Sequence, residues 1–145
     1  MLLTIEKVAI LKSVDIFGHT PDYILASVAA IIEEVSLDPD ETFIQEGDIE
    51  DSMFIVVDGE VQVHSQGKGI IKLGPGQIVG ELAVLDPEPR AASVSSIGDT
   101  LLFRIDKEPF DEVMADRPEV AQAIITTLCQ RIREQGRALA TARVS

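Results

Sequence analysis

Residues 80–94 read Gly-Glu-Leu-Ala-Val-Leu-Asp-Pro-Glu-Pro-Arg-Ala-Ala-Ser-Val, and this stretch is the most informative part of the chain. It places a carboxylate, Glu81, and a guanidinium, Arg90, at the two ends of a segment built mostly of small or apolar residues. An arginine in such surroundings needs an anion, because an unpaired buried charge is costly. Two partners are open: an internal ion pair with Asp86 or Glu88, and a ligand phosphate, which a planar guanidinium binds through two parallel hydrogen bonds.

The same stretch has the pattern of an anion-binding turn. Gly80 permits close approach of the backbone, and residues 81–85 are long enough for one short helical turn whose free N–H groups favour negative charge. Two prolines then end the turn and stiffen the path to Arg90. A phosphate would meet backbone donors on one side and Arg90 on the other, whereas Glu81 must face a hydroxyl donor such as a sugar. Phosphate and sugar hydroxyl together describe a nucleotide.

Both residue type and spacing in this stretch match a known pattern. Gly80-Glu81-Leu82-Ala83 is followed, after six residues, by Arg90-Ala91-Ala92-Ser93-Val94. The pattern resembles the phosphate-binding cassette of the cyclic nucleotide-binding domain family, which includes protein kinase A regulatory subunits, catabolite activator proteins and cyclic-nucleotide-gated channels. The resemblance extends to Glu46-Gly47-Asp48, residues 53–61 and Leu73-Gly74-Pro75-Gly76, and covers roughly residues 10–135.

This resemblance implies a role for each matched residue. Glu81 would accept a hydrogen bond from the ribose 2′-hydroxyl, Arg90 would bind the cyclic phosphate, and their neighbours would supply backbone donors and line the pocket. The expected ligand-binding residues are Gly80, Glu81, Leu82, Ala83, Arg90, Ala91 and Ala92. Family members that favour cyclic GMP often carry Thr after the Arg. Ala91 stands there, so the resemblance favours cyclic AMP over cyclic GMP.

The residue that covers the base is left open by the sequence. The family usually closes its pocket with an aromatic or long residue from the last helix, and no aromatic follows Phe110. Four residues of that helix are candidates: Leu128, Arg131, Ile132 and Arg133.

Periodicity divides the chain, expected to be a single domain over residues 1–145, into three zones. Residues 1–35 have helical spacing, residues 36–105 carry short apolar runs between Gly, Pro or Asp turns, and residues 106–145 are helical again. Short strands at regular spacing predict a mainly β fold, an antiparallel β-roll or jelly-roll barrel of about eight strands. The N-terminal and C-terminal helices would pack on it.

Local signals refine the three zones. Thr20 is predicted to cap the second helix, with Pro21 as its first residue, and Asp106 to cap the third. Asp58-Gly59 and residues 67–69 are predicted hairpin turns. The last helix, from residue 118, carries an apolar stripe: Val120, Ile124, Leu128 and Ile132.

Composition narrows the classes of function. A net charge of −13 disfavours binding to nucleic acid or to an anionic membrane, but does not exclude a small anion in a sheltered site. The single cysteine, Cys129, excludes an intramolecular disulfide and, with no membrane-spanning or secretory segment, favours a cytoplasmic protein. Only two histidines, His19 and His64, are present, so no metal site is expected. No nucleophile has a suggested base, and we expect no enzyme activity.

Two functions from different classes therefore remain. The first is a sensor domain that binds cyclic AMP and signals through movement of its C-terminal helix to an attached or partner effector. The second is a structural or protein-interaction domain that keeps the fold and binds no nucleotide. The apolar stripe of the last helix leaves a homodimer open.

Overall fold

Helices flank a central block of strands in the computed structural model, which describes residues 1–144. The helical elements are α1 (Thr4–Lys12), the single 3-10 turn η1 (Asp15–Phe17), α2 (Asp22–Ala29), α3 (Lys107–Asp116) and α4 (Pro118–Val144). The strands are β1 (Glu33–Leu37), β2 (Thr42–Ile44), β3 (Ser52–Asp58), β4 (Val61–Ser65), β5 (Lys68–Leu73), β6 (Ile78–Val79), β7 (Ser93–Ser96) and β8 (Thr100–Asp106).

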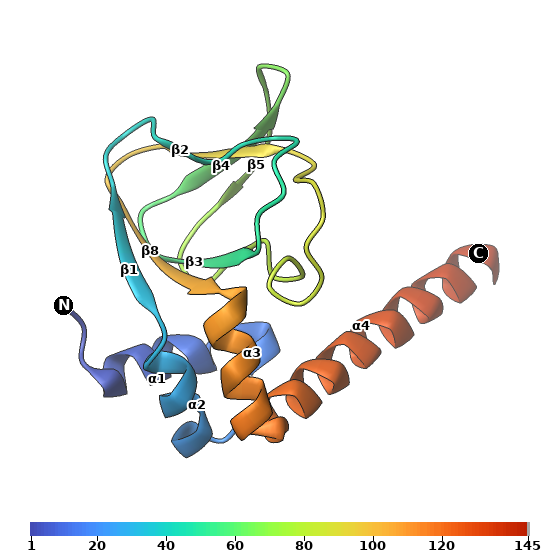
Figure 1. Cartoon of the computed structure of the whole chain (residues 1–145). Coiled ribbons are helices and arrows are strands. Elements are labelled where there is room, and N and C mark those ends of the chain that lie inside the picture. The colour runs from blue at the N-terminus through green and yellow to red at the C-terminus, as the bar shows by residue number, and fades with distance from the viewer. Residues whose placement is uncertain (145) are drawn as a thin grey trace.

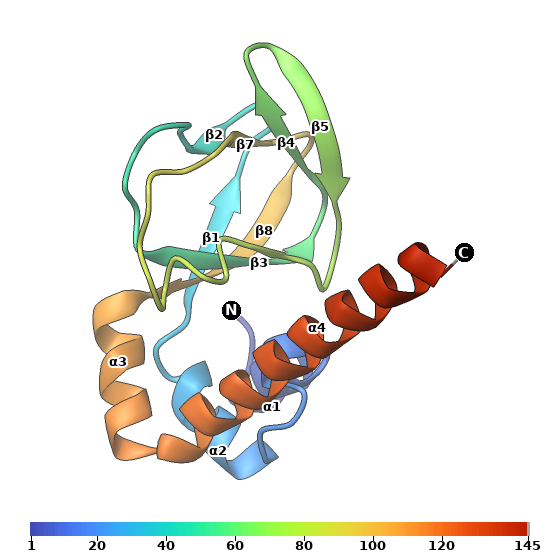
Figure 2. The ribbon, with the colours of Figure 1, turned by 90° about the vertical axis from the view of Figure 1, so that its right-hand side faces the viewer.

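The strands form two four-stranded sheets, with the orders β1-β8-β3-β6 and β2-β7-β4-β5. Their pairings are antiparallel. The sheets are the two sides of a roll, and the helices gather beneath the sheet that contains β3 and β8 (Figure 1, Figure 2). The predicted mainly β fold with flanking helices is confirmed, as a roll whose two sheets stay separate and do not close into a barrel.

Strand β3 shows why continuous apolar runs in the sequence predict the positions of buried strands. Met53 and Ile55 belong to the apolar cluster shared with the helices, whereas Phe54 and Val56 belong to the cluster between the two sheets. Successive side chains of a strand point to opposite faces. A strand buried on both faces therefore has a continuous apolar sequence, and each such side chain contributes about 1.5–3 kcal/mol by leaving water.

The first boundary between helix and strand differs from the expectation. Helix α2 ends at Ala29, and β1 begins at Glu33, inside the range expected to be helical. Ile32 continues the spacing of Val28, which extends the helical pattern past the true end. Within residues 1–144, strand β1 lies at the edge of its sheet and pairs with β8. Glu33 and Ser36 are exposed and Glu34 is half-buried, so these polar residues mask the strand pattern.

Two local predictions are wrong. Thr20 does not cap α2, because Pro21 is extended (ψ 146°) and the helix begins at Asp22. The Thr20 hydroxyl is instead buried and has no hydrogen-bond partner within the described residues. The turn between β4 and β5 is Gln66-Gly67, one residue earlier than expected, and both residues have positive φ (54° and 76°), as a two-residue type I′ hairpin requires.

Helix α4 divides into a packed half and a projecting half. Val120 and Ile124 are 0% and 2% exposed in the helical cluster, whereas Ile132, on the predicted stripe, is 67% exposed. Residues 132–143 are exposed, and the C-terminal end of α4 extends away from the body of the protein (Figure 1, Figure 2). The expected stripe is therefore a core stripe only in its first half.

Candidate functional site

The segment of residues 80–91 connects β6 to β7 and is built from hydrogen-bonded turns. Ala83 N donates to Gly80 O (3.0 Å), Leu85 N to Leu82 O (3.0 Å) and Asp86 N to Leu82 O (2.7 Å). The expected helical turn is thus a run of turns, and the Ala83 N–H, expected to face a phosphate, is already bonded. Val84 is fully buried in the helical cluster and anchors the segment to the core.

The returning limb of this segment is held by backbone hydrogen bonds to the loop after β2. Arg90 N donates to Asp48 O, and Gly47 N donates to Arg90 O, both at 2.9 Å. Ile49 and Pro89 form an isolated antiparallel bridge beside them. Arg90 therefore has a fixed backbone position even though it lies outside the named strands.

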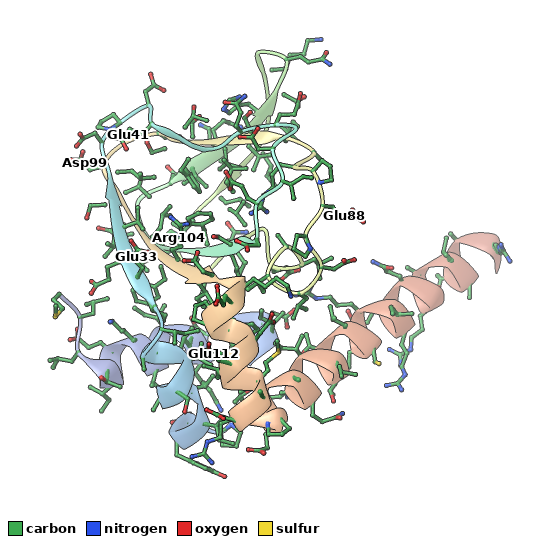
Figure 3. All side chains as sticks on the ribbon, viewed as in Figure 1. Glu33, Glu41, Glu88, Asp99, Arg104 and Glu112 are labelled. Atoms are coloured by element: carbon green, nitrogen blue, oxygen red, sulfur yellow. The ribbon has the colours of Figure 1, made fainter. Side chains whose placement is uncertain are left out.

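The Arg90 side chain is almost fully enclosed, with 9% of its surface exposed. Its Nη2 donates to the Ser52 carbonyl oxygen at 2.6 Å and lies 3.8 Å from a carboxylate oxygen of Glu50. Within residues 1–144 its buried Nε has no hydrogen-bond partner. The acidic partner is thus Glu50 and neither Asp86 nor Glu88, and Figure 3 shows the Glu88 side chain directed outward from its loop.

Gly80 leaves the space that the Arg90 guanidinium occupies. A Cβ built on Gly80 would overlap Nη1 of Arg90 and lie 3.0 Å from its Cζ. The φ angle of Gly80 is also positive, at 72°. Both the conformation and the close approach therefore require glycine at the start of the segment.

Glu81 lies opposite, in an ion pair with helix α4. Nη1 of Arg131 donates to Oε1 of Glu81, and Nη2 donates to Oε2 at 3.2 Å. The same guanidinium donates from Nε (3.0 Å) and Nη2 (2.6 Å) to Oδ2 of Asp15 in η1. The hydrogen bonds to Glu81, followed by those to Asp15, raise the pKa of Arg131 above its ordinary value.

These residues surround one cavity of about 570 Å³. Six of the seven expected ligand-binding residues line it: Gly80, Glu81, Leu82, Ala83, Arg90 and Ala91. Ala92 is half-buried and is not part of the lining. The volume of the cavity lies in the range that is typical of small-molecule binding sites.

The chain also matches a family model, described as the cyclic nucleotide-binding domain, over residues 34–117. The match spans more than half of the chain and includes the whole cavity-forming segment. The chain belongs to the cyclic nucleotide-binding domain family.

Curated relatives of this cyclic nucleotide-binding domain are longer proteins. The Pycsar effector protein XpPycTIR of Xanthomonas perforans is 37% identical over 95 residues, which cover 65% of this chain and 31% of that protein. A CRP-like cAMP-activated global transcriptional regulator of Mycobacterium tuberculosis is 26% identical over 136 residues, 90% of this chain and 61% of that protein. The chain therefore spans less than two thirds of the length of either relative.

Two solved structures are also similar to this domain in fold and sequence. The N-terminal domain of a transcriptional regulator from Streptomyces coelicolor A3(2) superposes with a TM-score of 0.84 at 27% identity, covering 90% of this chain and 94% of that one. The regulatory domain of Toxoplasma gondii PKA, crystallised with cAMP, gives a TM-score of 0.69 at 27% identity over 76% of this chain and 44% of that one.

The last helix contributes one of its four candidate residues to the cavity of this domain. Arg131 lines the cavity. Leu128 packs against the helical cluster, and Ile132 is exposed. Arg131 is therefore the candidate cover for a ligand, and it is held by an acidic residue, Asp15, that also lines the cavity.

Sequence reasoning did not find Asp15, Glu50 or Ser52 as parts of this site. Each contacts its arginine across a long stretch of chain, up to 116 residues for Asp15 and Arg131. Local spacing carries no signal for such pairs. The sequence around Asp15 contains no feature that marks it as the partner of a residue 116 positions away.

None of the helices within residues 1–144 has the length and hydropathy to cross a membrane. No group of three or more His, Cys, Asp or Glu side chains in that range is arranged to hold a metal ion.

Proposed function

We propose that this regulatory domain binds cyclic AMP in the 570 Å³ cavity between the 80–91 segment and helix α4. One observation carries the proposal: the Arg90 side chain is 9% exposed, and the carboxylate of Glu50 lies 3.8 Å from its Nη2. A buried arginine with so distant a counter-ion favours a bound anion. The M. tuberculosis relative named as cAMP-activated and the T. gondii domain crystallised with cAMP support the same ligand.

In the proposed pose each part of the nucleotide faces a different wall. The cyclic phosphate lies against Arg90 and the N–H groups of Leu82 and Ala91, and the ribose lies against Glu81. The purine extends towards α4, where Arg131 covers it. Ala91 offers no hydroxyl to guanine, which favours cyclic AMP over cyclic GMP.

The signal leaves the site through the segment's contacts with the C-terminal helices. The Lys107 ammonium at the start of α3 donates to the carbonyls of Leu85 (3.3 Å) and Val84 (3.5 Å). Leu85 and Leu128 both pack against the helical cluster. A ligand that draws the segment inward would shift α4 and an effector attached to it, in the cytoplasm, with a coupling of about 1–3 kcal/mol.

Calorimetric titration of the chain with cyclic AMP, cyclic GMP and linear 5′-AMP tests the proposal. We expect cyclic AMP to bind most tightly and Arg90→Ala to weaken it by about 2–5 kcal/mol, because the lost charge pair is sheltered. Arg137→Ala is the matched control, since Arg137 is exposed on the projecting half of α4 and lies outside the cavity. The control should bind as wild type does.

The second candidate function is a domain that keeps the fold and binds no nucleotide. One observation favours it: Glu81 and Arg90 both have protein partners, Arg131 and the Ser52 carbonyl. Absence of heat with all three nucleotides at high concentration would select this alternative. An Arg90→Ala variant that unfolds more easily but binds cyclic AMP unchanged would instead show that Arg90 is an internal ion-pair partner and does not hold the ligand.

A further inference from the structure

Arg131 joins three elements that are far apart in the sequence. Its guanidinium donates to Glu81 in the 80–91 segment and to Asp15 in η1, while its backbone lies in α4. It is the last residue of α4 before the fully exposed half begins. The position of α4 and the orientation of Glu81 are therefore linked through one side chain.

The hydrogen-bond geometry leaves Glu81 able to bind a further donor. Arg131 contacts both carboxylate oxygens of Glu81, one from each Nη atom. An ionised carboxylate has about four acceptor positions, so each oxygen keeps one for another donor. Glu81 keeps a quarter of its side-chain surface exposed (25%) in the wall of the cavity.

Asp15 fixes the guanidinium in this orientation. It accepts from Nε and Nη2, so four N–H···O contacts hold the planar group between the two carboxylates. A lysine at 131 could not reproduce this fork, because an ammonium is a point donor on a flexible stem. The fork thus contacts both carboxylate oxygens of Glu81 and orients the carboxylate, in addition to balancing its charge.

We propose that Arg131, held by Asp15, is a positioning residue that orients Glu81 towards the ribose 2′-hydroxyl. Sugar recognition then depends on the position of α4. The inference rests on the proposed function, since it needs a ribose at Glu81. By linkage the dependence is reciprocal: the hydroxyl that binds Glu81 also favours the α4 position that keeps Arg131 on it.

The test compares cyclic AMP with 2′-deoxy cyclic AMP, which lacks only the hydroxyl. We expect wild type to bind cyclic AMP with a dissociation constant at least roughly tenfold lower than that for 2′-deoxy cyclic AMP. This factor corresponds to the loss of one hydrogen bond to a charged group. Glu81→Gln and Arg131→Ala should bring that ratio close to one. Arg131→Lys and Asp15→Asn should give intermediate ratios, because each keeps only part of the fork.

Arg133→Ala is the matched control on the same helix, since Arg133 is exposed and absent from the cavity lining. It should keep the wild-type ratio. The ratio is the decisive readout, because a variant that merely loosens the fold weakens both nucleotides alike. Thermal unfolding of each variant, followed by circular dichroism, verifies that it is folded at the temperature of the titration.

Three outcomes would overturn the inference. An Arg131→Ala variant that keeps the wild-type ratio, or loses both nucleotides equally, would show that Arg131 does not act through Glu81. Equal, measurable binding of the two nucleotides by wild type would remove the role of Glu81 while leaving the proposed function intact. Binding of neither nucleotide by wild type would overturn the proposed function, and the inference with it.

Discussion

At the scale of single residues, Gly80 is as demanding a position as the charged residues it adjoins. Any side chain there meets the Arg90 guanidinium and adopts an unfavourable positive φ of 72°. The backbone strain alone costs about 1–2 kcal/mol, and the overlap displaces the guanidinium from the cavity wall. We expect Gly80→Ala to lower cyclic AMP affinity by roughly tenfold or more and to lower the free energy of unfolding.

Calorimetry and denaturant unfolding measure the two effects of Gly80→Ala. Gly136→Ala is the control, because no atom lies within 4 Å of the added Cβ and the residue lies in α4. The control should leave affinity unchanged and stabilise the helix by about 0.5–1 kcal/mol. Wild-type affinity in Gly80→Ala would mean that Arg90 is not held against the ligand as we propose.

The contrast between Glu81 and its partner illustrates what the sequence can predict at this scale. Glu81 and Arg90 are recognisable because they stand at fixed spacing within one short segment of the chain. Arg131 lies 50 residues from Glu81 and 116 from Asp15. Only the packing of α4 against η1 brings these charges together, so they stay hidden until the helices are placed.

At the scale of elements, the end of β8 contains a polar cluster that supports the cavity wall. Asp106 stands at the N-cap of α3, as predicted, but its side chain does not cap the helix. It accepts instead from the Ser52 hydroxyl (2.6 Å) and Arg104 Nε (2.8 Å), while the Ser52 carbonyl accepts from Arg90. Asp106 therefore orders the β3 residue that holds the Arg90 guanidinium.

This cluster predicts a dependence of stability on pH. Burial raises the pKa of Asp106, but the hydrogen bonds from Ser52 and Arg104 outweigh burial and leave the pKa below its ordinary value of 3.8. A carboxyl group whose pKa is lower in the folded state stabilises the fold at pH values above its ordinary pKa. This stabilisation is lost as the pH falls through the folded-state pKa. Asp106→Asn should thus unfold at a lower temperature than wild type at pH 7.

The two unfolding temperatures should converge as the pH falls below the folded-state pKa of Asp106, where the carboxyl is protonated in both the folded and unfolded states. Circular dichroism melts between pH 2 and pH 7 measure this. Asp111→Asn is the control, because Asp111 is half exposed and its ion pair, with Lys107, lies within α3. A difference between Asp106→Asn and wild type that stays constant with pH would exclude the charge of Asp106 as its cause.

The strands differ in how well they can be predicted from the sequence. Strands β3 and β8 are buried on both faces and read as apolar runs, so they are found readily from the sequence. Strand β6 has only two residues, and β1 contains the polar residues Glu33, Glu34 and Ser36. Their formation depends on pairing with β3 and β8, a property of the sheet that local sequence does not encode.

At the scale of the whole molecule, charge and shape separate the body from the end of α4. Residues 132–143 carry Arg133, Arg137 and Arg143 against a single acid, Glu134, although the chain as a whole has a net charge of −13. All twelve are exposed, and the ribbon projects beyond the roll (Figure 2). The exposed end of α4 is therefore basic, whereas the rest of the chain is strongly acidic.

This division predicts two rates of amide hydrogen exchange within one helix. Residues 118–131 pack on the helical cluster and should exchange slowly, whereas residues 132–144 form a stretch short enough to be marginal in water and should exchange rapidly. Exchange followed by mass spectrometry at low protein concentration measures both. Concentration-dependent protection of the distal half would contradict this, since it would mean that a second copy covers the exposed stripe of Ile125, Ile132 and Leu139.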